Sequence, residues 1–237
     1  MDQSEGTTMT EFPIVPMLKV ENLRKSFGSL SVIDDLSFEV GAGERLLVLA
    51  ASGSGKTTLL KILAGLMTSD KGKFTFQGVK NPVLLFQEAR LFPHLTVLEN
   101  ILLPLTVHSQ IPSREKQERI SEWLNKLNLF AFKEIYPHHL SGGMKRKVSL
   151  LRAFITDPDF LLLDEPFQSL DADSKQTILT EILPAYANVP ILFTTHDLME
   201  IPLLATSILY FDTPYLGKPN RIGTASFEKI FTKGARL

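Results

Sequence analysis

The sequence contains no cysteine, a single tryptophan and no surplus of charge of either sign. The absence of cysteine excludes disulfide bonds and thiolate metal sites, and it suits a reducing compartment. The 25 basic and 26 acidic side chains give a formal net charge of −1. Such a balance provides no electrostatic footprint for DNA or RNA, so we expect no nucleic-acid partner.

Long hydrophobic runs are also missing. The longest apolar stretches, residues 101–105 and 201–211, fall short of the ~20 residues that a helix needs to cross a bilayer. Residues 1–16 are polar and acidic, and they lack the basic-then-apolar order of a secretory signal. We therefore expect a flexible N-terminal tail over 1–16 and a soluble, cytoplasmic protein.

Short apolar runs of strand length recur along most of the chain. RLLVLA (45–50) is continuous and leads directly into a Gly-rich turn and a helical pattern. Residues 18–23 and 36–40 alternate apolar and polar side chains, as half-exposed antiparallel strands do. Further buried strands are predicted at 83–86, 160–164, 191–195 and 208–211. Since helical patterns lie between most of these strands, we predict an α/β fold with a mainly parallel sheet and an N-terminal antiparallel β portion.

The middle of the chain differs, because it shows helical patterns and no strand signal. Helices are predicted around 96–103, 114–129 and 144–156. One face of the second helix carries Ile120, Trp123, Leu124 and Leu127. We predict an inserted α-helical subdomain at about 90–156. It belongs to a single domain at 17–237, whose core occupies about 17–89 and 157–237.

The stretch ASGSGKTT (51–58) follows a strand and precedes a helix, which is the context of a phosphate-binding loop. Gly53 and Gly55 allow successive N–H groups to converge on phosphate oxygens. Lys56 supplies a positive charge toward the β/γ-phosphates, and the Thr57 hydroxyl is the expected Mg²⁺ ligand. The sequence thus predicts a P-loop NTPase (RecA-like) core. Its nucleotide contacts come from Ala50, Ala51, Ser52, Gly53, Ser54, Gly55, Lys56, Thr57 and Thr58.

Ala50 departs from the loop pattern, which normally begins with glycine. Alanine is tolerated at this position if its φ is negative. A positive φ would impose strain of order 1 kcal/mol or more. We expect nucleotide binding to survive.

Two adjacent acids, Asp164 and Glu165, end the apolar run FLLLDEP (160–166). A buried strand does not carry adjacent carboxylates without a reason. Asp164 suits a ligand of the magnesium shell, and Glu165 suits the base that deprotonates an attacking water. In isolation such a pair could simply face solvent, but the upstream phosphate loop favours the catalytic interpretation. His196 follows the next strand, where a lone histidine is more often structural than catalytic.

A second anion site is indicated by LSGGMKRKVSLLRA (140–153), where a serine and two glycines open an amphipathic helix. The free N–H groups and the positive end of the dipole at such a start favour an anion. The basic run at 145–147 in the same helix is interpreted as a solvated helix face rather than a phosphate or lipid contact.

Taken together, the motifs resemble those of the nucleotide-binding subunit of an ABC transporter. The stretch 51–58 resembles its Walker A motif, LSGGM its signature motif, and FLLLDE its Walker B motif. Gln87 falls in its Q-loop, SLD (169–171) in its D-loop, and His196 at its switch histidine. Phe27 falls where the family stacks an aromatic ring on adenine.

The resemblance implies a head-to-tail dimer. ATP and Mg²⁺ would lie between the phosphate loop of one copy and the signature residues Ser141, Gly142 and Gly143 of the other. It further implies that Gln87 and His196 sense or stabilise the γ-phosphate and that Asp171 ties the two sites together. Glu165, His196, Gln87 and Lys56 would be the catalytic residues. The magnesium ligands would be Thr57, Gln87 and Asp164.

Within the family, the stretches 83–105 and 164–172 are most similar to importers of the nitrate, sulfonate and taurine type. This likeness implies integral membrane permease subunits as partners, an extracytoplasmic solute-binding protein indirectly, and a peripheral location on the cytoplasmic face of the membrane. Leu91, Phe92 and Pro93 would suit docking of a permease or, equally, packing within the subunit. Gln168 and Arg146 depart from the residues usual in this group. A soluble ABC-type ATPase and a poorly hydrolysing regulator remain as alternatives.

Overall fold

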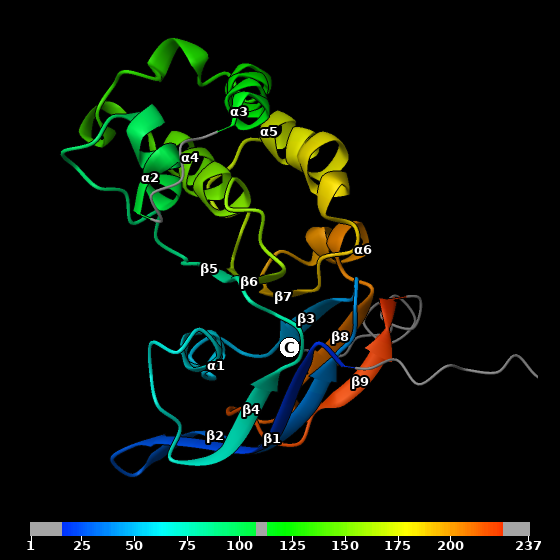
Figure 1. Cartoon of the computed structure of the whole chain (residues 1–237). Helices are drawn as coiled ribbons and strands as arrows, with labels where there is room; N and C mark the ends of the chain where they lie inside the picture. The colour runs from blue at the N-terminus through cyan, green and yellow to red at the C-terminus, as the bar shows by residue number, and fades with distance from the viewer. Residues whose placement is uncertain (1–15, 108–112, 225–237) are drawn as a thin grey trace, which may run out of the picture.

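The computed structural model describes residues 16–107 and 113–224. Residues 1–15, which carry most of the predicted tail, lie outside the described residues. Figure 1 shows two regions: a core built from two sheets, and a group of helices gathered over the face of the larger sheet that lies opposite α1 (Lys56–Leu63) and the smaller sheet. In the described part of the chain, no helix combines the length and apolar character that crossing a bilayer requires.

The smaller sheet is antiparallel and has the strand order β2-β1-β4. Its first two strands form a hairpin that pairs Leu18 with Val40 and Phe27 with Leu30. The predicted alternation holds for Leu18 and Val20, which are buried, but it is interrupted before the buried Leu23 by a shift in the register of the hairpin. β4 was not predicted from the sequence. The bounds are β1 (Leu18–Phe27), β2 (Leu30–Val40) and β4 (Lys71–Phe76).

The larger sheet has six strands in the order β5-β6-β7-β3-β8-β9. All neighbouring strands are parallel except β9, which runs antiparallel to β8. The bounds are β3 (Arg45–Leu49), β5 (Pro82–Leu85), β6 (Phe160–Asp164), β7 (Ile191–Thr194), β8 (Ser207–Tyr210) and β9 (Asn220–Gly223). The predicted α/β fold with a mainly parallel sheet, an antiparallel portion and a helical subdomain is confirmed. Of these strands, β9 was not predicted.

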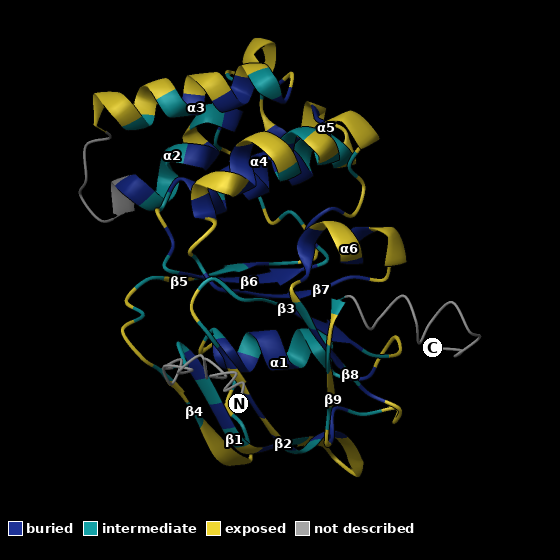
Figure 2. Cartoon of the chain, turned by 90° about the vertical axis from the view of Figure 1, so that its right-hand side faces the viewer, coloured by how far each residue is buried: buried dark blue, intermediate teal, exposed yellow. Residues whose placement is uncertain are grey.

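The two faces of the larger sheet belong to different hydrophobic clusters. Leu46 and Val48 pack with the smaller sheet and α1 (Lys56–Leu63), whereas Leu47 and Leu49 pack with the helical subdomain. Successive side chains of a strand point to opposite faces, so β3 contributes to both clusters. Its continuous apolar sequence follows from this double burial. Figure 2 shows α1 between the two sheets.

Among its described residues, the helical subdomain contains the α-helices α2 (Val97–Val107), α3 (Arg114–Lys126) and α4 (Gly142–Phe154), with short 3-10 helices at Phe130–Phe132 and Pro137–His139. The face predicted for the second of them is confirmed, because Ile120, Trp123, Leu124 and Leu127 are all buried. The chain then returns to the core through β6. Short helical segments follow at α5 (Ala172–Thr177), Ile178–Ile182, Leu183–Tyr186, Leu198–Glu200 and α6 (Ile201–Leu204).

Candidate active site

The predicted phosphate loop connects β3 to α1, at the carboxyl end of a central strand. Its last glycine, Gly55, has φ +103°, and a Cβ atom there would lie 2.8 Å from the carbonyl oxygen of Val32. Only glycine fits this position. Gly55 is the N-cap residue of α1, and none of the described side chains caps this helix. The N–H groups of the first turn are therefore free to meet an anion.

Ala50 is not among the non-glycine residues that have positive φ. The strain that a positive φ would impose on alanine is therefore absent. Ala50 instead packs against the cluster formed by the smaller sheet and α1. The loop accommodates alanine at its first position without distortion of the backbone.

The Lys56 side chain folds back over the loop. Its Nζ donates hydrogen bonds to the carbonyl oxygens of Ala50 and Ala51, both at 2.8 Å. Burial lowers the pKa of Lys56, and the nearby charges of Glu165 and Asp164 oppose this shift. Lys56, Asp164 and Glu165 line the same cavity beside the phosphate loop.

Asp164 is fixed by two hydroxyl groups. Thr57 Oγ1 donates to its Oδ2 at 2.6 Å, and Thr194 Oγ1 donates to its Oδ1 at 2.7 Å. The carboxylate is buried, with the residue only 3% exposed. These contacts join the first turn of α1 to the ends of β6 and β7. Thr194 was not singled out from the sequence. Its position at the end of an apolar strand, like that of Asp164, was a signal that could have identified it.

Glu165 adopts a positive φ of 48°, which is uncommon for a residue with a side chain. Its N–H donates to Thr194, to the carbonyl oxygen at 3.2 Å and to Oγ1 at 3.1 Å. Its Oε2 contacts Nδ1 of His196. Strained backbone of this kind costs about 1–3 kcal/mol and persists only where surrounding contacts hold it. The predicted base and the predicted switch histidine are thus direct neighbours.

One cavity of about 250 Å³ is lined by six of the nine residues predicted at the phosphate loop, 50–58. Its lining includes Gln87, from the loop after β5, together with both acids. The predicted residues in this lining are Ser52, Gly53, Gly55, Lys56, Thr57, Thr58, Gln87, Asp164 and Glu165. Ser54, also in the loop, is buried, and its hydroxyl has no hydrogen-bond partner within the described residues. Phe27 is half exposed and lies outside this lining.

The signature residues do not line this cavity. Ser141 caps α4, since its Oγ accepts a hydrogen bond from Met144 N at 3.2 Å. Ser141 and Gly142 are exposed. A Cβ atom on Gly143 would lie 2.7 Å from the carbonyl oxygen of Ser169, so glycine is required there as well. The predicted site residues therefore form two separate groups within one chain.

The prediction of a solvated basic face at 145–147 is wrong. Arg146 is 2% and Lys147 7% exposed. Helical periodicity identified the apolar stripe of α4 but gave no sign that loops of the core also cover the helix. Lys147 Nζ donates to the carbonyl oxygen of Leu127 at 3.3 Å and pairs with Asp171. Arg146 lies between the turns that follow β5 and β6.

Asp171 has a structural role within its own chain. It caps α5, accepting a hydrogen bond from Ser174 N at 2.8 Å. Hydrogen bonds from Ser174 and the neighbouring Lys147 hold the pKa of Asp171 well below its usual range. The predicted D-loop acid is thus ionised and fixed in place.

A buried ion pair that was not predicted from the sequence holds the segment that carries His196, the predicted switch histidine. Glu200 is 4% exposed and accepts hydrogen bonds from Lys175 Nζ at 2.7 Å and Thr195 Oγ1 at 2.6 Å. Lys175 also pairs with Asp197 at 3.1 Å. These contacts tie α5 to the segment that carries His196. A second hollow of about 220 Å³ lies between them.

The loop after Gln87 is held by another residue that the sequence did not reveal, Asn100. Its buried amide accepts a hydrogen bond from Phe92 N at 2.8 Å and donates to the carbonyl oxygens of Phe92 and Leu95 at 3.1 and 2.9 Å. Leu91 packs against the core cluster, whereas Phe92 and Pro93 are exposed. Leu91 therefore packs within the subunit, and only Phe92 and Pro93 remain available for the alternative, docking of a permease.

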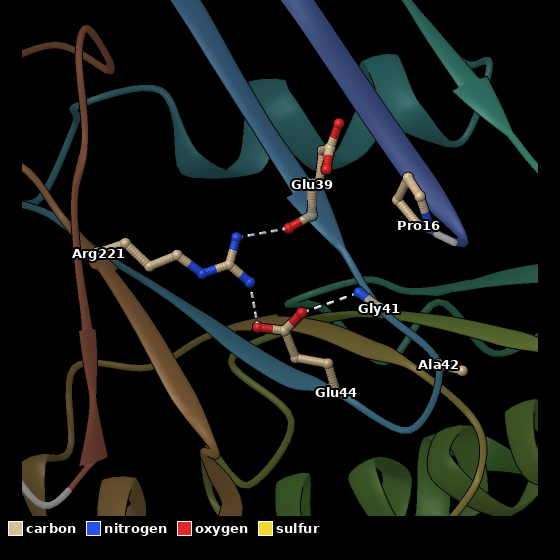
Figure 3. A pocket seen from close by; sticks show the side chains of 6 residues that line it. All are labelled: Pro16, Glu39, Gly41, Ala42, Glu44 and Arg221. Carbon is tan, nitrogen blue, oxygen red and sulfur yellow. Dashed lines mark hydrogen bonds and ion pairs between the residues drawn. The ribbon is translucent and has the colours of Figure 1, made fainter. Parts of the chain in front are cut away.

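A larger cavity of about 410 Å³ lies at the opposite, amino end of β3 (Figure 3). Arg221 reaches across it to the carbonyl oxygen of Glu39, at 2.8 Å, and to the Glu44 carboxylate. None of the predicted site residues lines it. In open α/β sheets, ligands bind at the carboxyl ends of the strands, which favours the cavity at the phosphate loop.

Comparison with known proteins agrees with this arrangement. A family model described as "ABC transporter" matches residues 33–168, more than half of the chain. An aliphatic sulfonates import ATP-binding protein, SsuB, from Corynebacterium glutamicum is 39% identical over 199 residues, which is 83% of this chain and 81% of the relative. A probable sulfate/thiosulfate import ATP-binding protein, CysA, from Chlorella vulgaris is 36% identical, covering 87% of this chain and 90% of the relative.

A spermidine/putrescine import ATP-binding protein, PotA, from Nitrosospira multiformis is 37% identical, and the match covers 88% of this chain but only 61% of the relative. Among solved structures, an ATP-binding subunit of an ABC transporter superposes with a TM-score of 0.80 at 25% identity, over 93% of this chain and 96% of the other. A dimeric, post-hydrolysis ATP-binding cassette with bound ADP and phosphate gives a TM-score of 0.75 at 25% identity, over 88% and 99%. With its phosphate loop, paired acids and signature helix arranged as described, the chain belongs to the ABC transporter family, as an ATPase of that family.

Proposed function

We propose that the chain hydrolyses Mg²⁺-ATP in the cavity at the phosphate loop and so energises a solute importer. The support is a set of groups at that cavity suited to a triphosphate: the uncapped start of α1 and the ammonium group of Lys56. Gly55 has a positive φ that glycine adopts readily, and such a loop conformation lets successive N–H groups converge on a phosphate.

The residues predicted to hold magnesium fit that ion. Thr57, Gln87 and Asp164 offer hydroxyl, amide and carboxylate oxygen atoms, which are the hard donors that Mg²⁺ prefers. Thr57 and Asp164 are already in direct contact, and Gln87 lines the same cavity. Bound there, Mg²⁺ would offset the charge that develops on the transferred phosphoryl group.

Glu165 is the proposed general base, and His196 the residue that orients it. A base must hold its carboxylate at one position to accept a proton from water. The contact with Nδ1 of His196 restricts the side chain of Glu165, and the hydrogen bonds that its N–H donates to Thr194 restrict its backbone. Lys56 would leave the carbonyl oxygens of Ala50 and Ala51 to meet the phosphates.

The second anion site belongs, in this proposal, to a partner's nucleotide. The exposed start of α4 does not share a cavity with Lys56 of its own chain. Two copies arranged head to tail would place Ser141, Gly142 and Gly143 of one against the triphosphate of the other. Phe27, exposed at the end of β1, would stack on adenine, and Asp171 would lie between the two sites.

This dimer can be tested by size. Glu165→Gln should bind ATP without hydrolysing it and elute as a dimer by light scattering, while Ser141→Arg in the same background should stay monomeric. Ser113→Arg is the matched control, because Ser113 caps α3 through a hydrogen bond of the same length, 3.2 Å. A monomeric Glu165→Gln protein at saturating ATP would refute the arrangement, as would a dimer that Ser141→Arg leaves intact.

The proposed partners are integral membrane permease subunits, served by an extracytoplasmic solute-binding protein, which places the chain on the cytoplasmic face of the membrane. The relatives named above are import ATP-binding proteins. The exposed pair Phe92 and Pro93, on a loop fixed by Asn100, offers a firm apolar contact for a permease. Copurification of the chain with permease subunits from membranes tests this step.

For the substrate class we propose the nitrate, sulfonate and taurine type. The sulfonate relative and the signature ending in Met144 support this choice. The test is a deletion strain, in which uptake of labelled taurine, sulfonate and nitrate is compared with that of sulfate and putrescine. Loss of at least one of the first three, with the last two unchanged, is expected. Loss of putrescine or sulfate uptake alone would refute the class and leave the ATPase assignment standing.

A further inference from the structure

The Arg146 guanidinium is buried, and within the described part of the chain it donates hydrogen bonds to backbone carbonyl groups alone. Its Nε donates to Pro166 O at 2.8 Å. Its Nη1 donates to Phe86 O and, at 3.0 Å, to Gln87 O. Its Nη2 donates to Glu165 O and, at 2.8 Å, to Asp164 O.

These five contacts use every nitrogen of the guanidinium, which carries five N–H groups in a rigid fork. Burial lowers the pKa of Arg146 to about 10, and the charges of Asp164, Glu165 and Glu200 oppose this shift. Removing such a cation from water is costly in free energy. The five carbonyl groups offset this cost only while they keep their present positions around the guanidinium.

The carbonyl groups come from the two turns that carry the proposed chemistry. Three belong to consecutive residues, 164 to 166, and include that of the strained Glu165. The other two belong to Phe86 and Gln87, at the end of β5. Convergence of three successive carbonyls on one cation holds the turn in which Glu165 has positive φ.

Arg146 itself lies in α4, one turn beyond the signature residues. The same side chain therefore links the helix proposed to serve a partner's nucleotide with the loop and turn that serve the chain's own. Among the described residues, Arg152, further along α4, donates to a single carbonyl oxygen, that of Arg90, at 3.0 Å and three residues beyond Gln87, and has no hydrogen bond to the turn of Glu165. General anchoring of the helix would not require all five contacts to fall on the Gln87 and Glu165 segments.

We propose that Arg146 is a positioning residue for hydrolysis, holding Glu165 and Gln87 in register with the signature helix. The proposal rests on the catalytic role assigned to Glu165 above. Because Arg146 touches no residue of the phosphate loop, its loss should impair turnover much more than nucleotide binding.

The first test compares Arg146→Lys with Arg146→Met and with the control Arg152→Lys. Phosphate release gives kcat and KM, and a fluorescent trinitrophenyl-ATP probe gives affinity. We expect Arg146→Lys, which keeps the charge but loses the fork, to lower kcat at least tenfold with affinity changed less than threefold. Arg146→Met should lower kcat further than Arg146→Lys does, and Arg152→Lys should keep kcat within twofold of the wild-type value. Parallel losses of kcat, affinity and melting temperature in Arg146→Lys would overturn the proposal, as would an unchanged kcat.

The second test is a double-mutant cycle with Glu165→Gln, measured in single turnover. If Arg146 acts through Glu165, adding Arg146→Lys to Glu165→Gln should lower the residual rate less than twofold. A further tenfold loss would show that the two residues act independently and would overturn the proposal. Wild-type turnover in Glu165→Gln alone would instead refute the role of Glu165, a distinct outcome. Arg146→Lys carries the test even if Arg146→Met does not fold.

Discussion

Lys147 Nζ lies 3.1 Å from Asp171 Oδ2, so that the signature helix α4 is joined to the start of α5 within one chain. Lys147 is largely buried, whereas the Asp171 side chain is 58% exposed. An exposed ion pair alone contributes little to stability. Here the same carboxylate also caps a helix, so the two functions of Asp171 reinforce each other.

Replacing Asp171 with alanine should lower the free energy of unfolding by about 0.5–2 kcal/mol at pH 7, the range for loss of an N-cap. Folding depresses the pKa of Asp171 below its ordinary value of 3.8. Its contribution is therefore present above that value and is lost as the pH falls below it. Urea denaturation at pH 7 and at successively lower pH should show the difference between wild type and variant shrinking. Asp173→Ala, in the same helical turn, is the control; a gap independent of pH would contradict the assignment.

Ala50→Gly should change ATP turnover by less than about tenfold, because Ala50 does not occupy the positive-φ region and glycine relieves no strain there. Glycine should instead destabilise the fold by about 0.4–1 kcal/mol, through the greater freedom of the unfolded chain. Phosphate release and thermal melts measure both effects. A much larger gain in turnover would mean that the loop is impaired as it stands, which is the basis of the regulator alternative.

Asn100→Ala should lower the free energy of unfolding by about 3 kcal/mol, since it removes a buried amide that serves several backbone groups. Without this amide, the loop at 91–96 should open more often. Chymotrypsin should then cleave after Leu95 of this loop faster than in wild type, since Pro93 protects the bond that follows Phe92. Asn125→Ala, which removes one exposed hydrogen bond on α3, should change stability by less than about 0.5 kcal/mol. Equal cleavage rates in Asn100→Ala and wild type would show that Asn100 does not hold the loop.

The sequence predicted those parts of the site that depend on local pattern. The phosphate loop is one contiguous motif between a strand and a helix, and Asp164 with Glu165 ends a strand. Parallel topology then brings these segments to the same edge of the sheet. Likewise, the 3.6-residue period located the buried face of α3.

What the sequence could not predict depends on contacts between distant segments. Arg146 meets Phe86 and Gln87 across 60 and 59 positions of the chain, and no periodicity within α4 encodes those carbonyl groups. A run of three basic residues was therefore misinterpreted as solvated. Asn100 and Glu200 were missed for a similar reason, since a single polar residue in an apolar segment does not reveal which backbone groups it will satisfy.

The double burial of β3 fixes the spacing that leads to the phosphate loop. Its side chains are divided between two packing layers by strict alternation. Inserting or deleting one residue between Arg45 and Ala50 would therefore send each leucine to the wrong layer. Apolar substitutions can be accommodated along β3, but a change in its length cannot. The two hydrophobic clusters together therefore fix the distance between the amino end of β3 and the phosphate loop.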